Sequence, residues 1–508
     1  MELTYIVLIA LTVIYIPLFL YVRLRKKPEN SMLEPYGPTI MIKTKVGIRL
    51  IDRLGKYKRF WHVCGYASRI ITILLMAYIV GIIILDLILL PQAIGRGGMG
   101  IEYALAIPGL NPMLPIVYGW IGLIVAMVMH ELSHGIQSRA NDITVDSTGL
   151  LYAVVPVGAF VEPNEEEIEK ASRGARMDLY AAGITMNFII AVITFILMFS
   201  LAAGTLHSDY DENPAIYGYT SGSPFIEYDI PTTSIIMEVD GVTITGTDQF
   251  YEIVDAKGYS TDYTLTYRYK GDVVTKTVTL GTYVNGVVKG SPADGILESG
   301  DYIIKLGDTV IGSPTSMTDF LKNTKPGDVV SMTYYDKSAG TNVDTTITLG
   351  DNGGKGYVGI TTTLSGISIT TPNAILNSGI NPYYGRSDLS GFVNGTIGYL
   401  ANAFNGFSPV PESTQWWYHS SFAPDGVFWI MMSLLYWIFW LNIVLGVTNA
   451  LPAVPFDGGF LFMGGVEFIA ERIIKDEEKR KRIVDVICSA TTYFMIFALI
   501  LVLLVIIF

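Results

Sequence analysis

One short motif in the sequence has residue types and a spacing that could form a metal centre: His130-Glu131-Leu132-Ser133-His134. On an α-helix, residues four apart differ by about 400° of rotation, so both histidines project from one face and can reach one metal ion. Neutral imidazole suits Zn²⁺, and a catalytic zinc typically has three protein ligands and one water. Glu131 is placed to take a proton from that water as general base. The motif predicts a zinc hydrolase with one ligand still to be found.

The best candidate for the third ligand is Asp457, in the proline- and glycine-rich segment 449–459. A carboxylate oxygen would complete a His₂-carboxylate zinc site. Considered without the histidines, an aspartate after a proline-broken apolar run is more typical of a turn. Prolines and glycines permit irregular backbone, which is tolerated at membrane depth only where it lines a cavity. We therefore predict that His130, His134 and Asp457 bind Zn²⁺.

The elements that must position these residues are apolar runs long enough to cross a bilayer. The 508 residues are 50% hydrophobic and 16% charged, whereas soluble globular proteins have about 25% charged residues. A polytopic α-helical membrane protein with about six transmembrane helices is predicted, and a bilayer core needs about 20 residues for each. The predicted spans are 3–22, 70–90, 113–138, 179–203, 427–447 and 483–508. Ionisable residues in such spans indicate function, because they are costly unless they face a cavity or a metal.

The distribution of charge predicts the orientation in a cell membrane. Residues 23–69 carry 12 basic and 3 acidic side chains, whereas residues 204–425 carry 24 acidic and 11 basic ones. By the positive-inside rule, the first segment is expected in the cytoplasm and the acidic insert outside. Residues 91–115 are expected to form an external turn, and the active site is expected near the cytoplasmic side. The basic residues flank apolar spans, so the bilayer is the expected partner and nucleic acid is not.

Only two cysteines, Cys64 and Cys488, are present, and they lie far apart in sequence. They cannot form a disulfide framework or a cysteine-based zinc site, so redox chemistry is not expected.

The acidic insert contains an internal repeat with a spacing of 67 to 70 residues. Gly222-Ser223-Pro224 recurs as Gly290-Ser291-Pro292, and Thr277–Gly281 recurs as Thr346–Gly350. Such a repeat predicts two small β-rich domains. The second copy resembles a PDZ domain of the kind attached to prokaryotic membrane proteases, and the first resembles a more degenerate PDZ domain. A PDZ domain binds an extended peptide by strand addition, so peptide termini are expected partners. A β-rich spacer without a ligand is the alternative.

These features divide the chain into six predicted parts. They are an anchor helix with a basic cytoplasmic loop (1–69), the first part of the membrane core with the histidine motif (70–203), the first PDZ-like copy (204–282), the second copy (283–370), an extracytoplasmic linker (371–425) and the second part of the membrane core with the aspartate (426–508).

With these motifs in place, the chain resembles the site-2 protease family of intramembrane zinc metalloproteases. The resemblance rests on the histidine motif, on Asn449-x-x-Pro452 with Phe456-Asp457-Gly458, and on the PDZ-like insert between them. It implies that His130, His134 and Asp457 hold zinc and that Glu131 is the base. The implied reaction is cleavage of transmembrane segments of membrane-bound substrate proteins, that is, regulated intramembrane proteolysis.

The resemblance implies two further elements. Residues 151–161 resemble the family's membrane-associated β-hairpin, which holds the substrate in extended form. Residues 182–187 resemble its Gly-Pro-x-x-Asn element, although Ile184 stands in place of the proline. Asn187 and Asn449 are polar groups in or beside apolar spans, and they could hydrogen-bond the substrate backbone or simply join helices.

Two other functions fit parts of the sequence. A catalytically silent membrane scaffold or peptide receptor would use the PDZ-like copies for binding and the metal for stability. A membrane zincin with a glutamate ligand from residues 162–169 is less favoured, because that hydrophilic stretch is more typical of a solvated face. The Glu131→Gln variant distinguishes the first alternative from a protease, since only a protease would lose an activity.

Overall fold

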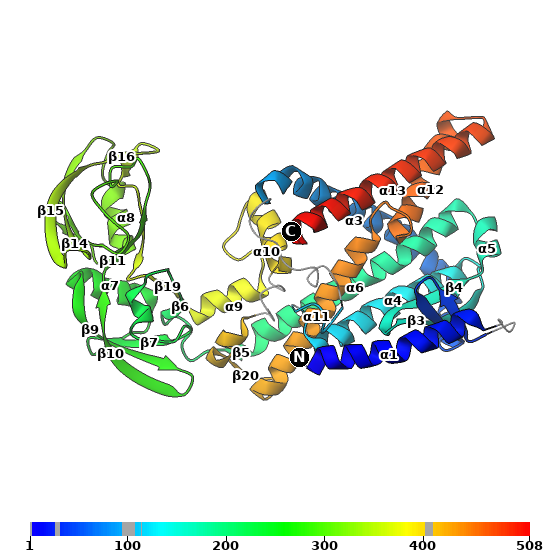
Figure 1. Ribbon diagram of the computed structural model, residues 1–508, viewed down its shortest axis with the longest axis horizontal. Helices are drawn as coiled ribbons and strands as arrows, with labels where there is room; N and C mark the ends of the chain where they lie inside the picture. Colours follow the sequence, from blue (N-terminus) through cyan, green and yellow to red (C-terminus); the bar gives the residue numbers. More distant parts are fainter. Residues whose placement is uncertain (1–2, 26–30, 94–106, 113, 402–409, 508) are drawn as a thin grey trace. The chain divides into compact units, whose positions relative to one another are not determined.

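The computed structural model describes residues 3–25, 31–93, 107–112, 114–401 and 410–507. These residues form two compact units (Figure 1). The membrane unit comprises residues 1–200, 400–408 and 430–508, and the insert unit comprises 201–399 and 409–429. Residues 94–106 and 113 of the predicted external turn and residues 402–409 of the predicted linker lie outside the described part.

Among the described residues, five helices are long and apolar enough to cross a membrane. They are α3 (Lys58–Ala93), α4 (Ile116–Ala140), α6 (Arg173–Thr205), α11 (Asp425–Asn449) and α13 (Glu477–Ile507). Apolar side chains such as Val128, Ile196 and Phe497 are exposed on them, as expected for helices surrounded by hydrocarbon. The first predicted span forms α1 (Leu3–Leu24), whose apolar stretch Leu11–Leu24 is shorter. A membrane protein is thus supported, and the count of six spans and their orientation stay predictions.

A four-stranded antiparallel sheet with the order β1-β2-β3-β4 belongs to the membrane unit. The strands are β1 (Leu33–Tyr36), β2 (Thr39–Thr44), β3 (Val145–Ala153) and β4 (Val155–Pro163). The hairpin β3–β4 contains the predicted residues 151–161, and the basic segment before α3 adds β1, β2 and the short helix α2 (Ile48–Gly55). The helix α5 (Glu165–Lys170) follows β4, and the side chain of Asn164 caps it. Because β4 stands at the end of the strand order, it is an edge strand of this sheet.

The helix α12 (Asp457–Ile473) begins at the predicted aspartate ligand. Ion pairs tie it to the start of α6: Arg173 to Glu471 at 2.5 Å and Arg176 to Glu467 at 3.1 Å. A Cβ on Gly464 would stand 2.8 Å from a side-chain atom of Met177. The close approach and the ion pairs together hold α12 against the start of α6.

The insert unit contains both predicted copies in one sheet, with the order β10-β9-β7-β6-β19-β18-β11-β12-β14-β15. The first copy contains β6 (Ala215–Tyr219), β7 (Ile235–Val239), β8 (Val242–Thr243), α7 (Thr247–Lys257), β9 (Ser260–Tyr269) and β10 (Asp272–Leu280). The second contains β11 (Thr282–Val287), β12 (Tyr302–Leu306), β13 (Thr309–Val310), α8 (Pro314–Lys322), β14 (Val329–Asp336), β15 (Thr341–Thr348), β16 (Gly350–Asn352), β17 (Lys355–Tyr357) and β18 (Ile360–Leu364). Each copy has a hydrophobic core of its own.

The second copy is inserted into the first. The last strand of the insert, β19 (Ile367–Thr370), pairs with β6 of the first copy, whereas β18 pairs with β11 of the second. Ile367 is accordingly buried in the core of the first copy. The predicted division assigned residues 283–370 to the second copy, but β19 hydrogen-bonds to the first, because the chain returns there after completing the second.

The remaining elements of the insert unit connect it to the membrane helices. The helices α9 (Pro372–Ile380) and α10 (Leu389–Ala401) follow β19, and two short strands, β5 (Leu206–His207) and β20 (His419–Ser420), pair with each other. Two 3₁₀ helices, η2 (Pro224–Ile226) and η4 (Glu412–Trp417), complete the described elements. β5 directly follows α6, and β20 closely precedes α11.

Candidate metal centre

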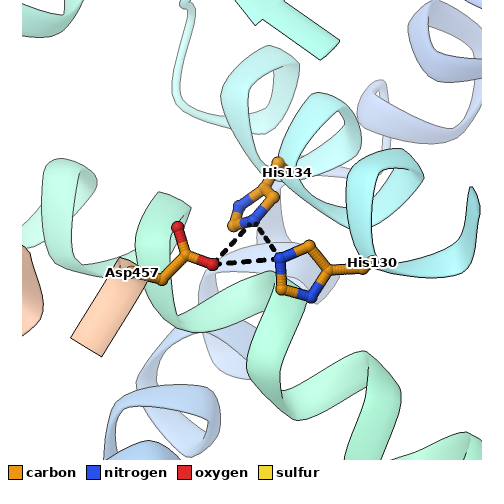
Figure 2. A group of neighbouring side chains, drawn as sticks. All are labelled: His130, His134 and Asp457. Carbon is orange, nitrogen blue, oxygen red and sulfur yellow. Dashed lines mark hydrogen bonds and ion pairs between the residues drawn. The ribbon is translucent and has the colours of Figure 1, made fainter. Parts of the chain in front are cut away.

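The three predicted ligands converge in the membrane unit (Figure 2). Nε2 of His130 lies 3.1 Å from Nε2 of His134, and Oδ2 of Asp457 lies 3.0 and 3.2 Å from these two nitrogens. Both histidines are buried, and the Asp457 side chain is 17% exposed. Among the described residues, these three form the group of potential ligands whose ligand atoms lie close enough to one another to hold one metal ion.

The size of this triangle fits a tetrahedral zinc site. With zinc–ligand bonds of 2.0–2.1 Å, neighbouring ligand atoms are about 3.3 Å apart. The observed separations of 3.0 to 3.2 Å require only a slight expansion. Two imidazoles and one carboxylate are also a donor set typical of catalytic zinc, with a fourth position left for water. The residues therefore fit Zn²⁺.

A backbone carbonyl on α6 holds the ring of His134. Nδ1 of His134 donates a hydrogen bond of 2.7 Å to the carbonyl oxygen of Leu179. The bond fixes the proton on Nδ1 and leaves the lone pair of Nε2 for the metal, as is usual for a metal-binding histidine.

Asn187 holds the ring of His130 in a similar way. Its Nδ2 lies 3.2 Å from Nδ1 of His130, while its buried Oδ1 has no hydrogen-bond partner among the described residues. The two ends of an amide have nearly the same shape and are interchangeable in a structure without hydrogens. Exchanging them lets Oδ1 accept a hydrogen bond from Nδ1 of His130, which satisfies the buried oxygen and frees Nε2 for a metal. The orphaned oxygen thus fits a metal-binding His130.

The helix α6 reaches the centre through Gly183. A Cβ at this position would stand 2.4 Å from Nε2 of His134 and 2.6 Å from Cε1 of His130. Gly446 on α11 in turn packs against Asn187, where a Cβ would stand 3.2 Å from the Asn187 Cβ. Small residues allow such close helix packing in membranes. Gly183 thus brings α6 next to the two histidines, and Gly446 brings α11 next to Asn187.

A compact turn between α11 and α12 carries Asp457 into the centre. A Cβ on Gly458 would stand 2.3 Å from the carbonyl oxygen of Ala450, and one on Gly459 would stand 2.5 Å from the carbonyl carbon of Ala453. The backbone N–H of Val454 donates to Oγ1 of Thr492 on α13. The glycines are therefore required for the backbone to fold back on itself here.

Glu131 is held by the edge strand β4. The backbone N–H of Val161 donates a hydrogen bond of 3.0 Å to Oε2 of Glu131. Since β3 pairs with the other side of β4, this N–H points away from the sheet. Backbone groups of alternate residues point the same way, so Ala159 presents its N–H and C=O along the same free edge. The candidate base and the edge strand therefore lie side by side.

The two predicted asparagines differ in position. Asn187 is fully buried and contacts His130, whereas Asn449 is the half-buried last residue of α11. Three other residues contact the centre: Gly183 and Val161 lie in the two elements singled out by resemblance, but their contacts were not predicted, and Leu179 was not singled out. Leu179 and Val161 act through backbone groups, which carry no type-specific signal. Gly183 could have been found from the sequence, because it is the glycine of the element that resembles Gly-Pro-x-x-Asn, four residues before Asn187.

The fold and the candidate site define a class: a protein with several helices apolar enough to cross a membrane and with a buried His₂-carboxylate group of the kind that holds zinc in peptidases. The sequence profile of Peptidase family M50 matches residues 118–499, which include all three candidate ligands and Glu131. The chain belongs to this family, the site-2 protease family of metalloproteases. The uncharacterised protein MJ0971 of Methanocaldococcus jannaschii is 29% identical over 245 residues, which are 47% of this chain and 62% of that protein. The match therefore spans less than two thirds of that relative.

Two solved PDZ domains are similar to part of the chain. The domain of an SdrC-like protein from Listeria monocytogenes is 29% identical and covers 17% of this chain and 92% of its own, with a TM-score of 0.16. The corresponding domain from Listeria innocua is 31% identical and covers 16% of this chain and 92% of its own, with a TM-score of 0.15. Peptide binding by the insert stays a prediction.

Proposed function

We propose that this protein is a zinc-dependent intramembrane endopeptidase that hydrolyses transmembrane segments of other membrane proteins. The observation that carries the proposal is the triangle of ligand atoms from His130, His134 and Asp457, with sides of 3.0 to 3.2 Å. The ligands belong to helices that are apolar or packed against apolar helices, and membership of a metalloprotease family supports the same chemistry.

Each residue of the centre has a role in the proposed reaction. Zn²⁺, when bound, would polarise the scissile carbonyl and make water more acidic. Glu131 accepts a proton from the attacking water and passes it to the leaving amine. The hydrogen bond from Val161 keeps the Glu131 carboxylate oriented. Leu179 and Asn187 keep the two imidazoles in the orientation that ligation requires.

The substrate must reach the centre in an extended form, because a helix shields its carbonyls with internal hydrogen bonds. β4 is the last strand in its sheet, so an extended substrate segment would pair with its outer edge by strand addition. An extended segment on that edge would run past Val161 and therefore past Glu131. The proposed role of the β3–β4 hairpin is to hold the unwound substrate beside the base.

The proposal places the centre near the cytoplasmic side of the cell membrane and the PDZ-like insert outside. The net positive charge of residues 23–69 and the net negative charge of residues 204–425 support this orientation. In the insert, the PDZ-like copies would bind peptide termini and admit substrates that another enzyme has already shortened.

The experiment that tests this function measures metal content and cleavage together. Purified wild-type protein and the variants His130→Ala, Asp457→Ala and Glu131→Gln are analysed for zinc and incubated with a model transmembrane substrate. We expect one zinc per chain in the wild type and in Glu131→Gln, and loss of zinc in the two ligand variants. Among these four proteins, cleavage is expected in the wild type alone, and it is also expected in the control variant Glu166→Gln. Glu166→Gln is a matched control, because Glu166 is an exposed glutamate on α5 that pairs with Lys170.

Two results would contradict the proposal. If Glu131→Gln cleaves as fast as the wild type, Glu131 is not the base. If the folded wild type holds zinc but cleaves nothing, and peptide capture depends on the insert, the protein is a receptor with a structural metal.

A further inference from the structure

Two histidines outside the metal centre face each other in the insert unit. The chain has five histidines. Two of them form the centre, and His62 is exposed on α3. The other two, His207 on β5 and His419 on β20, are directly opposite partners in the two-stranded antiparallel sheet. In such a pair the Cβ atoms are about 4.5–5.5 Å apart, so the side chains lie on one face within reach of each other.

A carboxylate orients one of these rings. Oδ2 of Asp425 lies 3.0 Å from Nδ1 of His419, and Oδ1 of Asp425 accepts a hydrogen bond of 2.9 Å from the backbone N–H of Ser420. The second bond fixes the carboxylate, and the first holds the proton of His419 on Nδ1. Nε2 of His419 therefore keeps its lone pair. A carboxylate on the far nitrogen is the usual support for a metal-binding histidine.

We propose that His207 and His419 bind a divalent transition-metal ion, with Asp425 as the positioning residue of His419. Imidazole is a good ligand for Zn²⁺, Ni²⁺ and Cu²⁺, and poor for Ca²⁺ and Mg²⁺, which prefer oxygen. Water molecules complete the coordination, because the side chain of His419 is 56% exposed.

The rings must move slightly to share an ion. Their centroids are 6.4 Å apart, compared with 4.7 Å for His130 and His134. His207 is exposed, and rotation about its broad χ2 torsion would turn a ring nitrogen toward His419 while His419 keeps its bond to Asp425. The greater separation and the smaller number of protein ligands predict weaker binding than at the buried centre.

The location gives the bound ion a structural effect. β5 directly follows α6, and the carbonyl oxygen of Thr205, the last residue of α6, accepts a hydrogen bond of 3.0 Å from the backbone N–H of Ser421. Asp425 is the first residue of α11. An ion held by His207 and His419 would therefore fasten the end of α6 to the start of α11.

The test uses Ni²⁺ as a probe on the full-length, zinc-loaded protein in detergent. Nickel and zinc per chain are measured by elemental analysis, and the unfolding temperature is recorded with and without Ni²⁺. We expect the wild type and the control variant His62→Ala to hold one zinc and one nickel, and His207→Ala and His419→Ala to hold zinc alone. Ni²⁺ should raise the unfolding temperature of the first two proteins only. Asp425→Asn should bind Ni²⁺ with a dissociation constant about 10–100-fold larger.

A wild type that takes up no nickel beyond that of the His207→Ala/His419→Ala double variant would overturn the proposal. So would equal loss of nickel in His62→Ala. Zinc retention and an unchanged unfolding temperature without Ni²⁺ show that each variant is folded, so a misfolded variant is not mistaken for a lost ligand.

Discussion

Gly183 lies so close to His134 that a Cβ on the glycine would stand 2.4 Å from Nε2, the nitrogen proposed to bind zinc. An added methyl group cannot avoid this contact, because the backbone fixes the position of Cβ. Gly183 therefore sets the distance between α6 and the helix that carries both histidines.

We expect Gly183→Ala to displace the imidazoles and to reduce zinc content and cleavage at least tenfold. Overpacking of this kind typically costs about 1–3 kcal/mol, so the unfolding temperature should also fall. Gly81→Ala is the matched control, since Gly81 lies in the membrane helix α3 and a Cβ added there would meet no neighbouring group within 4 Å. Zinc analysis and thermal unfolding of both variants provide the check. Full zinc occupancy in Gly183→Ala would show that the helices separate at no cost to the centre.

The sequence predicts the ligands but not the atoms that hold them. His130, His134 and Asp457 have side chains typical of zinc sites, and the spacing of four places both histidines on one helical face. The support of His134 is the carbonyl of Leu179, a group that every residue has. Which carbonyl faces the imidazole depends on how α6 packs against α4, and that is a tertiary property.

Variants of Asn187 can distinguish its two possible roles, which are to position His130 and to bind the substrate. Asn187→Ala removes the hydrogen-bond partner of Nδ1 of His130, so zinc affinity should fall about 10–100-fold. Asn187→Asp keeps an acceptor oxygen at this place and should retain zinc. Competition with a chelator measures both affinities. If Asn187→Ala keeps its zinc affinity while KM for the substrate rises, Asn187 binds substrate and does not position His130.

The hydrogen bond from Val161 to Glu131 can be removed without touching the carboxylate. Val161→Pro has no backbone N–H, and proline is tolerated on an edge strand where the N–H faces outward. We expect kcat to fall at least tenfold with zinc retained. Val161→Ala keeps the N–H and serves as the control. Equal kcat values for the two variants would mean that β4 does not orient the base.

The sheet that carries β4 is expected to weaken in acid. Burial raises the pKa of Glu162. Hydrogen bonds from Lys43 and Ser147 and the charge of Lys43 together lower this pKa by more than burial raises it, so the net shift is downward. The pair between Glu162 and Lys43 joins β4 to β2 at 2.8 Å. Because the folded-state pKa is the lower one, the stabilisation is present above the unfolded value of about 4.3 and is lost as pH falls through the folded value.

Glu162→Gln should therefore lower the unfolding temperature at pH 7, and by less at pH 3. The effect is small, at most about 1 kcal/mol, since both side chains are partly exposed. An equal difference between wild type and variant at both pH values would assign it to packing and not to charge.

The insert shows why a repeat in sequence did not give the domain boundary. The spacing of 67 to 70 residues indicates two copies, but the strand that completes the first copy follows the second. A signal was present: Val358-Gly359-Ile360 recurs as Ser365-Gly366-Ile367 only seven residues later. Both glycines have positive φ, and each meets a serine of the repeated Gly-Ser-Pro motif, Ser291 and Ser223 respectively. The recurrence at Ser365-Gly366-Ile367 was missed because its interval of seven residues does not match the repeat spacing of 67 to 70 residues.

Because the second copy is inserted into the first, two deletions in the full-length protein are expected to differ in their effect on the first copy. The backbone N–H of Ser365 donates a hydrogen bond of 3.0 Å to the carbonyl oxygen of Gly281, so the two ends of the second copy are adjacent. Deleting residues 282–364 joins these ends and removes Leu364 from the core of the first copy, but it keeps β19 beside β6, so the first copy should stay folded with lower stability. Deleting residues 283–370, the division predicted from the repeat, removes β19 and the buried side chain of Ile367. The second deletion therefore removes one more large buried aliphatic side chain from the first copy than the first deletion does, and such a loss costs about 2–5 kcal/mol.

Limited proteolysis of the two deletion variants in detergent measures the difference. We expect the first copy to resist trypsin in the variant lacking residues 282–364 and to be cleaved rapidly in the variant lacking residues 283–370. Lys257, Arg268 and Lys276 supply cleavage sites within the first copy in both variants. Equal resistance would mean that the first copy is stable without β19, and the pairing of β19 with β6 would then be dispensable for its fold.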